Sequence, residues 1–516
     1  MSKGKLIKSS AIVMVLIILG KICAIFRDAL IANKFGVTYI TDMYTISLGV
    51  VYLLTTVSYG LTTTFIPIHT EYIQKTSKEK ANKFVNNVLN VYTVFTIIVI
   101  VILMIFSKQI IYIFAHGLTN NKEIFNTSVD IIRIMVLSLV FISIQSVITG
   151  VLQAHQEFYE PAAMSLASNL VFIVYLMFLT NKFGIYGFAI STVIGFLVQL
   201  IINLPKYKKL GYKYEFHFNI FDKDLKKIVI LMTPIIISTS LLQLNLFINR
   251  AFATNIYYGA PTILDFSNKI NTLAYEVFAI GIAMVVYPTL SSFAAEGNEK
   301  EYKNALVQSI NIILLIMVPA SIAIGVLRMP LITLIFKSGA FDNNAVNLTS
   351  NALLFYCPAM IAYGLRDILN KAFYAIKDTT TPMINSFIGI IINVAINIIL
   401  IKYMKVSGLT LATSISITIV TILMLLNLDK KLENIDLKSV VMSFLKIIIA
   451  SILMGVFIYE INKICLLYMG LTKITSIISL VICTIVGSIV YFLVIYLFKV
   501  KEFVYLIDII KNKLKK

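Results

Sequence analysis

The chain carries one pattern of glycine and proline positions twice. Gly60 and Pro67 recur as Gly281 and Pro288, because 281 − 60 and 288 − 67 both equal 221. Two further pairs share this offset: Pro161 with Pro382, and Gly187 with Gly408. Glycine and proline set helix kinks and close helix packing. We therefore expect a role in gating or lobe packing for Gly60, Pro67, Gly281 and Pro288. In an apolar chain, a duplicated helical unit is typical of transporters.

The composition is that of a membrane protein. Hydrophobic residues make up 59% of the chain and charged residues 13%, against about 25% charged residues in an average soluble domain. Apolar stretches long enough to cross about 30 Å of hydrocarbon recur along the whole length. The sequence therefore predicts an all-α polytopic membrane protein. The net charge of +19 lies in the short loops, which indicates membrane topology and not a nucleic-acid partner.

Hydropathy predicts about fourteen transmembrane helices. Their expected spans are 8–33, 40–68, 84–107, 127–152, 161–180, 184–204, 228–249, 262–292, 305–327, 346–374, 382–401, 406–427, 439–461 and 472–498. With the N-terminus placed inside, the inner segments hold more than twice as many Lys and Arg residues as the outer loops. By the positive-inside rule, both termini are expected in the cytoplasm.

The repeat offset of 221 spans six predicted helices, which is an even number. The two copies are therefore expected to be parallel, six-helix lobes related by an axis along the membrane normal. The predicted domains are an N-terminal lobe, a basic cytoplasmic linker, a C-terminal lobe, two extra helices and a basic amphipathic tail, at 1–205, 206–227, 228–427, 428–498 and 499–516. The basic loops and the tail are expected to contact anionic lipids of the inner leaflet.

Charged residues within the predicted helices indicate a water-filled cavity. Arg27 and Lys21 lie in the first helix, Asp42 opens the second, and Asp265 and Lys269 lie in the eighth at a spacing of i,i+4, which allows them to pair. Intramembrane charges face a cavity or a partner, and cations suit an anionic substrate. The competing interpretation is structural ion pairs and side chains that snorkel to the interface, which we favour for Arg366 and Lys371.

A cation site is the second, weaker hypothesis. Asn393 and Asn397 are spaced i,i+4 in one predicted helix and Thr413 lies in the next, so their oxygens could hold Na⁺. Polar packing between helices is the alternative interpretation, and we favour it. The sequence contains no phosphate-binding loop and no catalytic motif, so no enzymatic activity and no bound cofactor are expected. Transport would then run on Na⁺, on the membrane potential or on the substrate gradient.

Several stretches resemble the MurJ (MviN) family of bacterial lipid II flippases, within the MOP transporter superfamily. They read "FRDALIANKFGVTYITDMY", "TTTFIPIHTEY", "GVLQAHQEFYEPA", "MVVYPTLSSFA" and "KAFYAIKDTTTPMINSFIGIIINVAIN". The resemblance implies a multi-pass protein of the bacterial plasma membrane, expected to be a monomer. It implies transfer of a lipid-linked anionic peptidoglycan precursor from the inner to the outer leaflet by alternating access, with basic residues of a central cavity on the pyrophosphate. Helices 13 and 14 would hold the lipid tail.

The resemblance also assigns substrate-binding residues. Its helix-1 Arg-Asp pair falls on Arg27 and Asp28, and its acidic residue after the "FG…TD" turn falls on Asp42. An earlier basic position falls on Lys21, and a helix-8 cavity Arg falls on Lys269.

This chain departs from the family pattern in helix 2. Where many members carry Arg it has Thr55 or Thr56, and Lys269 is a point charge in place of a forked guanidinium. Four alternatives to a lipid II flippase are a flippase for another lipid-linked oligosaccharide, a MATE-like drug or cation antiporter, a membrane-embedded transferase and a non-transporting scaffold. An antiporter would favour acidic cavity residues, and a transferase would need a paired acid and base. The intramembrane charges argue against a scaffold.

Overall fold

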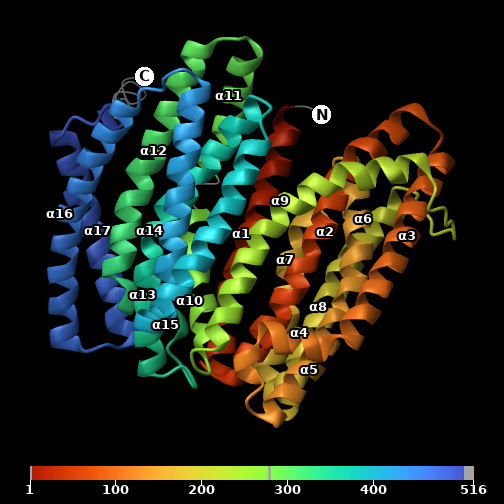
Figure 1. The fold of residues 1–516 in the computed structure, drawn as a ribbon, viewed down its shortest axis with the longest axis horizontal. Helices are drawn as coiled ribbons and strands as arrows, with labels where there is room; N and C mark the ends of the chain where they lie inside the picture. Colours follow the sequence, from red (N-terminus) through yellow and green to blue (C-terminus); the bar gives the residue numbers. More distant parts are fainter. Residues whose placement is uncertain (1–2, 277–280, 505–516) are drawn as a thin grey trace. The chain divides into compact units, whose positions relative to one another are not determined.

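The structure is a computed structural model that describes residues 3–276 and 281–504. All of its named elements are helices, as the composition predicts (Figure 1). Helices are the open-chain structure that satisfies every backbone N–H and C=O without water, which the hydrocarbon does not supply. Within the described residues, ten helices are long and apolar enough to cross a membrane. The number fourteen stays a prediction.

The chain divides into two compact units. Unit 1 comprises residues up to Thr262 together with Ser338–Phe341, and unit 2 comprises Ile263–Lys337 and the residues from Asp342 onward. The helices of unit 1 are α1 (Lys3–Phe35), α2 (Tyr39–Lys75), α3 (Lys78–Ile105), α4 (Ser107–Phe114), α5 (Lys122–Val136), α6 (Ser138–Ala154), α7 (Tyr159–Val174), α8 (Thr180–Lys209) and α9 (Lys223–Thr254), with short turns η1 (His116–Leu118) and η2 (Tyr175–Leu179). Those assigned to unit 2 are α10 (Ala260–Tyr275, which begins in unit 1), α11 (Gly281–Ala295), α12 (Glu299–Val326), α13 (Arg328–Phe336), α14 (Asn343–Ala375), α15 (Thr380–Lys431), α16 (Leu437–Met469) and α17 (Lys473–Leu497).

Element boundaries recur along the chain. Helix α3 begins at Lys78 and α12 begins at Glu299, so 299 − 78 gives the offset of 221 again, and both helices contain 28 residues. Two helical runs also break at the same relative place. Gly184 and Lys405 have positive φ angles of 53° and 51°, and 405 − 184 likewise equals 221. Both breaks lie at or beside the boundaries that hydropathy predicted between neighbouring spans.

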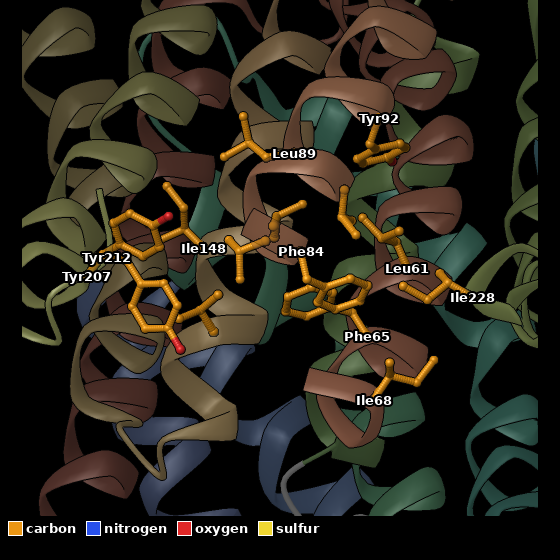
Figure 2. Packing of buried hydrophobic residues seen from close by; sticks show 14 of the residues in the cluster. Leu61, Phe65, Ile68, Phe84, Leu89, Tyr92, Ile148, Tyr207, Tyr212 and Ile228 are labelled. Carbon is orange, nitrogen blue, oxygen red and sulfur yellow. The ribbon is translucent and has the colours of Figure 1, made fainter. Parts of the chain in front are cut away.

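Aromatic side chains form the core at one end of unit 1. Phe84 of α3 stacks on Phe65 of α2, with ring centroids 5.7 Å apart (Figure 2). Phe84 also stacks on Tyr72 of α2, with ring centroids 4.4 Å apart. Tyr207 and Tyr212 stack at 5.3 Å in the same cluster. Offset stacking of large rings adds to the burial of apolar area. The same cluster contains residues from 61–92, 147–152 and 200–228, so it joins segments distant in sequence.

Small residues of α2 admit α9. A Cβ atom on Gly60 would lie 2.9 Å from Cγ1 of Ile236, which is closer than real Cβ contacts allow. Pro67 and Pro288 lie inside α2 and α11 and are both exposed. Gly281 is the first residue of α11, and its packing lies outside what the structure describes. Packing therefore places α9 in unit 1, whereas the repeat assigns it to the second lobe; the repeat-based domain boundaries stay a prediction.

We expect Gly60→Leu to lower the stability of the protein by about 1–3 kcal/mol, because overpacking forces α2 and α9 apart. Thermal unfolding in detergent measures the effect. The control is Thr63→Leu, one turn further along α2 at an exposed position. Equal melting temperatures for the two variants would contradict the close α2–α9 contact.

Asp378 lies in the loop between α14 and α15 and joins the two ends of α15. It accepts hydrogen bonds from the backbone N–H groups of Thr380 and Thr381 at 3.1 and 3.0 Å and forms an ion pair with Lys431. Partial burial raises the pKa of Asp378, but the hydrogen bonds from Lys431 and Thr381 outweigh it and lower that pKa to about 2.

The lowered pKa makes this contribution to stability pH-dependent. A carboxylate with a pKa of 3.8 when unperturbed and about 2 in the folded protein stabilises the fold above pH 3.8 and loses this effect as the pH falls toward 2. We expect the melting temperatures of the wild type and Asp378→Asn to differ most near neutral pH and to converge below pH 3.8. Glu301→Gln, at an exposed position, is the control that should show little difference at any pH.

Candidate functional site

The guanidinium of Arg27 is the centre of a polar group inside unit 1. Its Nε and Nη2 atoms donate to Oδ1 of Asp28 at 3.0 and 2.8 Å, and Nη1 donates to Oδ1 of Asn169 at 2.9 Å. The side chains of Arg27 and Asp28 are 18% and 9% exposed. The ring of Phe172 lies 5.7 Å from the guanidinium carbon. The predicted Arg27–Asp28 pair is thus a real, largely buried ion pair whose fork is held from two sides.

Asn169 is a residue that sequence reasoning missed. It is 2% exposed, and its Nδ2 donates to the backbone oxygens of Gly20 on α1 and Ser165 on α7. Its amide therefore fixes α7 against α1 and holds Arg27 in one orientation. The sequence signal was available, since an Asn in an apolar stretch is costly unless it has partners.

Asp42 lies in the first turn of α2, as predicted, and is buried. It is 1% exposed and accepts hydrogen bonds from the backbone N–H groups of Gly259 and Thr262 at 2.5 and 3.0 Å, and from the hydroxyl of Thr262 at 2.6 Å. Both carboxylate oxygens therefore cap the start of α10, where a negative charge is favoured by the helix dipole. A substrate-binding role for Asp42 stays a prediction. Lys21 lies one helix turn and a half before Arg27 on α1 and is partly exposed.

Lys269 belongs to unit 2. Its Nζ lies 3.0 Å from Oδ2 of Asp265, which confirms the i,i+4 pair that the spacing predicted. The same ammonium lies 5.2 Å from the ring centroid of Phe266. Because 32% of the Lys269 side chain is exposed against 12% of Asp265, the cation is the more accessible partner. This cation can therefore receive an anion while its own carboxylate holds it in place.

The predicted cation-site residues do lie together. Asn393 donates to the hydroxyl of Thr413 at 3.4 Å, and Asn397 donates to Oδ1 of Asn393 at 3.1 Å. All three are at most 3% exposed. The observed contacts are those of interhelical polar packing, and a Na⁺ site at these residues stays a prediction.

The expectation that Arg366 snorkels was wrong. It is 9% exposed, and its Nη2 donates to Ser386 of α15 at 2.8 Å, because the neighbouring helix supplies an acceptor inside unit 2.

Thr55 and Thr56, the positions where a family Arg is missing, lie on α2 and carry no charge. Thr56 contacts the hydroxyl of Ser240 on α9 at 2.9 Å.

Arg250 is a further cation that sequence reasoning missed. A Cβ atom on Gly49 would lie 2.9 Å from Nη1 of Arg250, so this guanidinium sits against α2 two turns before Thr56. It belongs to the last two turns of α9, and the sequence signal was a single Arg at the end of a long apolar stretch.

The comparisons with known proteins agree with one another. The family model described as "Lipid II flippase MurJ" matches residues 31–479. A probable lipid II flippase MurJ from Buchnera aphidicola subsp. Baizongia pistaciae is 26% identical over 80% of this chain and 81% of its own length. The lipid II flippase MurJ of Burkholderia cenocepacia is 24% identical over 80% and 82%.

Solved structures show the fold. A lipid II flippase MurJ in an inward closed conformation matches with a TM-score of 0.79, covers 94% of this chain and 98% of its own, and is 24% identical. An inward-facing multidrug resistance MATE family transporter of the MOP superfamily matches with a TM-score of 0.69, covers 82% and 98%, and is 15% identical. The helical arrangement is therefore shared across transporters with different cargo.

We expect Asp28→Ala to destabilise the protein by about 3 kcal/mol, because it leaves the Arg27 cation buried without its carboxylate. Thermal unfolding in detergent gives the measurement. The matched control is Glu71→Ala, which breaks the exposed Lys75–Glu71 pair and should cost less than about 1 kcal/mol. A double variant, Arg27→Met with Asp28→Leu, should recover most of the loss. Equal effects of Asp28→Ala and Glu71→Ala would contradict the buried pair.

Proposed function

The chain belongs to the MurJ family of lipid II flippases, and we propose that it moves lipid II, the undecaprenyl-pyrophosphate-linked peptidoglycan precursor, from the inner to the outer leaflet. The family model covers most of the chain, so the proposal applies to the whole protein. Such a protein is a transporter and not an enzyme, and it lies in the bacterial inner membrane with many passes. Its partner is the lipid-linked glycan, and we propose that it acts as a monomer.

The observation that carries the proposal is the oriented guanidinium of Arg27. Asp28 and Asn169 fix its plane inside a helical unit. A planar fork held in one orientation can receive a phosphate through two parallel hydrogen bonds. An unassisted pyrophosphate would cross hydrocarbon at a cost of many times thermal energy, and oriented cations remove most of that cost.

We propose that Lys269 contributes the second cation and that access alternates between the two sides of the membrane. A bound substrate shifts such an equilibrium only through contacts that differ between the states. Both cations already hold a carboxylate partner, Asp28 or Asp265. If the ion pairs rearrange between the two states, an anion that displaces or shares the carboxylates binds the two states with different affinity. This difference couples substrate binding to the change of state.

The finer architecture is also a proposal. Two parallel six-helix lobes are supported by the recurrence of helix boundaries at the repeat offset. A lipid-tail groove at 428–498 is supported by the many large apolar side chains that α16 and α17 expose, among them Val441, Ile449, Val456, Ile485 and Leu493. Cytoplasmic termini are supported by the Lys and Arg bias alone. The basic tail at 499–516 lies beyond the described residues from 505 onward.

The driving force is proposed to be the membrane potential or Na⁺. Asn393, Asn397 and Thr413 lie together, and their amide and hydroxyl oxygens support a cation site. None of these three residues is a carboxylate. The MATE-like fold by itself favours no cargo, since one fold hosts several functions. The cationic residues Arg27 and Lys269 favour an anionic cargo over a cationic drug.

We expect Arg27→Ala to abolish complementation of a flippase-depleted bacterium, and Arg27→Lys to restore part of it, because charge returns without the fork. Lys269→Ala should be severe and Lys269→Arg tolerated. Accessibility of labelled precursor on each leaflet measures the transport step directly. Lys300→Ala, at an exposed position of unit 2, is the control. Full complementation by Arg27→Ala at normal expression would refute the role of the guanidinium.

A further inference from the structure

The segment between α8 and α9 has no regular secondary structure, yet it is held along its length by one face of α3. Four asparagines of α3 hold it, and we call them the asparagine ladder: Asn82, Asn86, Asn87 and Asn90. Their amides exchange hydrogen bonds of 2.6–3.2 Å with backbone groups of alternate segment residues, which are Lys213, Glu215, His217 and Asn219. The ladder therefore does for this extended chain what a neighbouring strand does in a sheet.

Both ends of the segment are also fixed. The hydroxyl of Tyr212, which is 3% exposed, lies 2.9 Å from Nε2 of His69 and 2.9 Å from Nε2 of His155. Figure 2 shows the ring of Tyr212 beside that of Tyr207. At the other end, the hydroxyl of Tyr72 donates to Asp224 in the first turn of α9 at 2.6 Å. The segment is therefore part of unit 1 and not a loose tether.

This fixed backbone forces large apolar side chains outward. The residues between the ladder contacts, and those that follow, are exposed by 43–86%: Tyr214, Phe216, Phe218, Ile220 and Phe221. The hydroxyl of Tyr214 donates to Oδ1 of Asn90 at 3.0 Å, so the side chains without such a tie to α3 are those of the other four residues. We call residues 213–221 the aromatic loop. In water, such a contiguous apolar surface is unfavourable by about 25 cal/mol for each Å² that a partner could cover. Because the ladder prevents the loop from folding inward, these rings stay available for a partner outside the chain.

The position of the loop on α3 identifies that cover. Val94, Ile97 and Val101 follow Asn90 at i+4, i+7 and i+11, so they continue the ladder face of the same helix. They are 41%, 46% and 49% exposed, and they belong to a helix that is long and apolar enough to cross a membrane. Four residues of helix correspond to about 6 Å, so the loop contact at Asn90 ends about one turn before the first of these exposed apolar side chains. Figure 1 shows the yellow-green segment beside the upper part of α3.

We propose that the aromatic loop is an interfacial anchor that inserts its rings at the boundary between headgroups and acyl chains of the bilayer. Tyr and Phe side chains suit this layer because it is apolar on one side and wet on the other. Exposed lysines flank the rings at Lys208, Lys209 and Lys213, which suits anionic phospholipid headgroups. The occupant is thus the bilayer itself, and the anchor holds whether or not the chain transports lipid II.

A single tryptophan tests the anchor, because the natural chain contains none. Phe216→Trp is reconstituted into vesicles of phosphatidylcholine and phosphatidylglycerol with and without brominated acyl chains. Two positions of α3 bracket the loop: Glu79→Trp toward the water side and Ile98→Trp on the lipid-facing stretch. We expect Phe216→Trp emission to be blue-shifted relative to Glu79→Trp and to lose intensity with brominated lipid, as Ile98→Trp does, while aqueous iodide quenches it less than Glu79→Trp.

Phe218→Trp repeats the measurement at a second ring and guards against a local disturbance at 216. The anchor is refuted if both reporters behave like Glu79→Trp, with red-shifted emission, quenching by iodide and no loss with brominated lipid. It is also refuted if the rings are shielded from iodide in native membranes but not in the lipid vesicles, because a protein would then be the cover. Shielding of the rings from iodide in vesicles that contain no other protein supports the bilayer as the cover.

Discussion

A charge in hydrocarbon costs several kcal/mol unless it has a partner, and this cost governs the arrangement of the polar residues here. Arg27 is paired with Asp28 and Lys269 with Asp265, each at about 3 Å. The pairing holds both cations in a defined orientation. In the proposed function, a pyrophosphate would compete with these carboxylates for the cations, which would favour a ligand with more than one negative charge.

Local features of the fold followed from the sequence. Apolar runs of sufficient length predicted the helices, and glycine and proline spacing predicted an offset at which α3 and α12 do begin. The pair of Asp265 and Lys269 followed from helix geometry alone, because a spacing of i,i+4 puts both side chains on one face. The helices and this ion pair could be predicted because the physics that decides them lies within one helix or in the bilayer, whereas the two repeated lobes stay a prediction.

Partners from distant parts of the chain could not be predicted in the same way. Asn169 lies 142 residues from Arg27, and Thr262 lies 220 residues from Asp42. A carboxylate that caps another helix and a carboxylate that faces a cavity have the same local sequence, so the contacts of Asp42 with the start of α10 could not be predicted. Likewise, the position of Arg366 in its helix predicted a side chain at the membrane interface. Its acceptor, Ser386, lies on the neighbouring helix α15, so its burial could not be predicted from the local sequence.

The predicted repeat and the observed packing assign α9 differently, and the reason is physical. The repeat would make α9 the counterpart of α1, but contacts with unit 1 lie at both ends of α9. Tyr72 donates to Asp224 in its first turn, and Asp42 accepts a hydrogen bond from Gly259, five residues after its last residue. Gly60 lets its middle approach α2 closely. The division into units therefore falls at Thr262, inside the first turn of α10, and not at the linker. A linker that is clamped to α3 by asparagines has little freedom to act as a hinge, because its release would break the hydrogen bonds of the whole ladder and leave buried amides without partners.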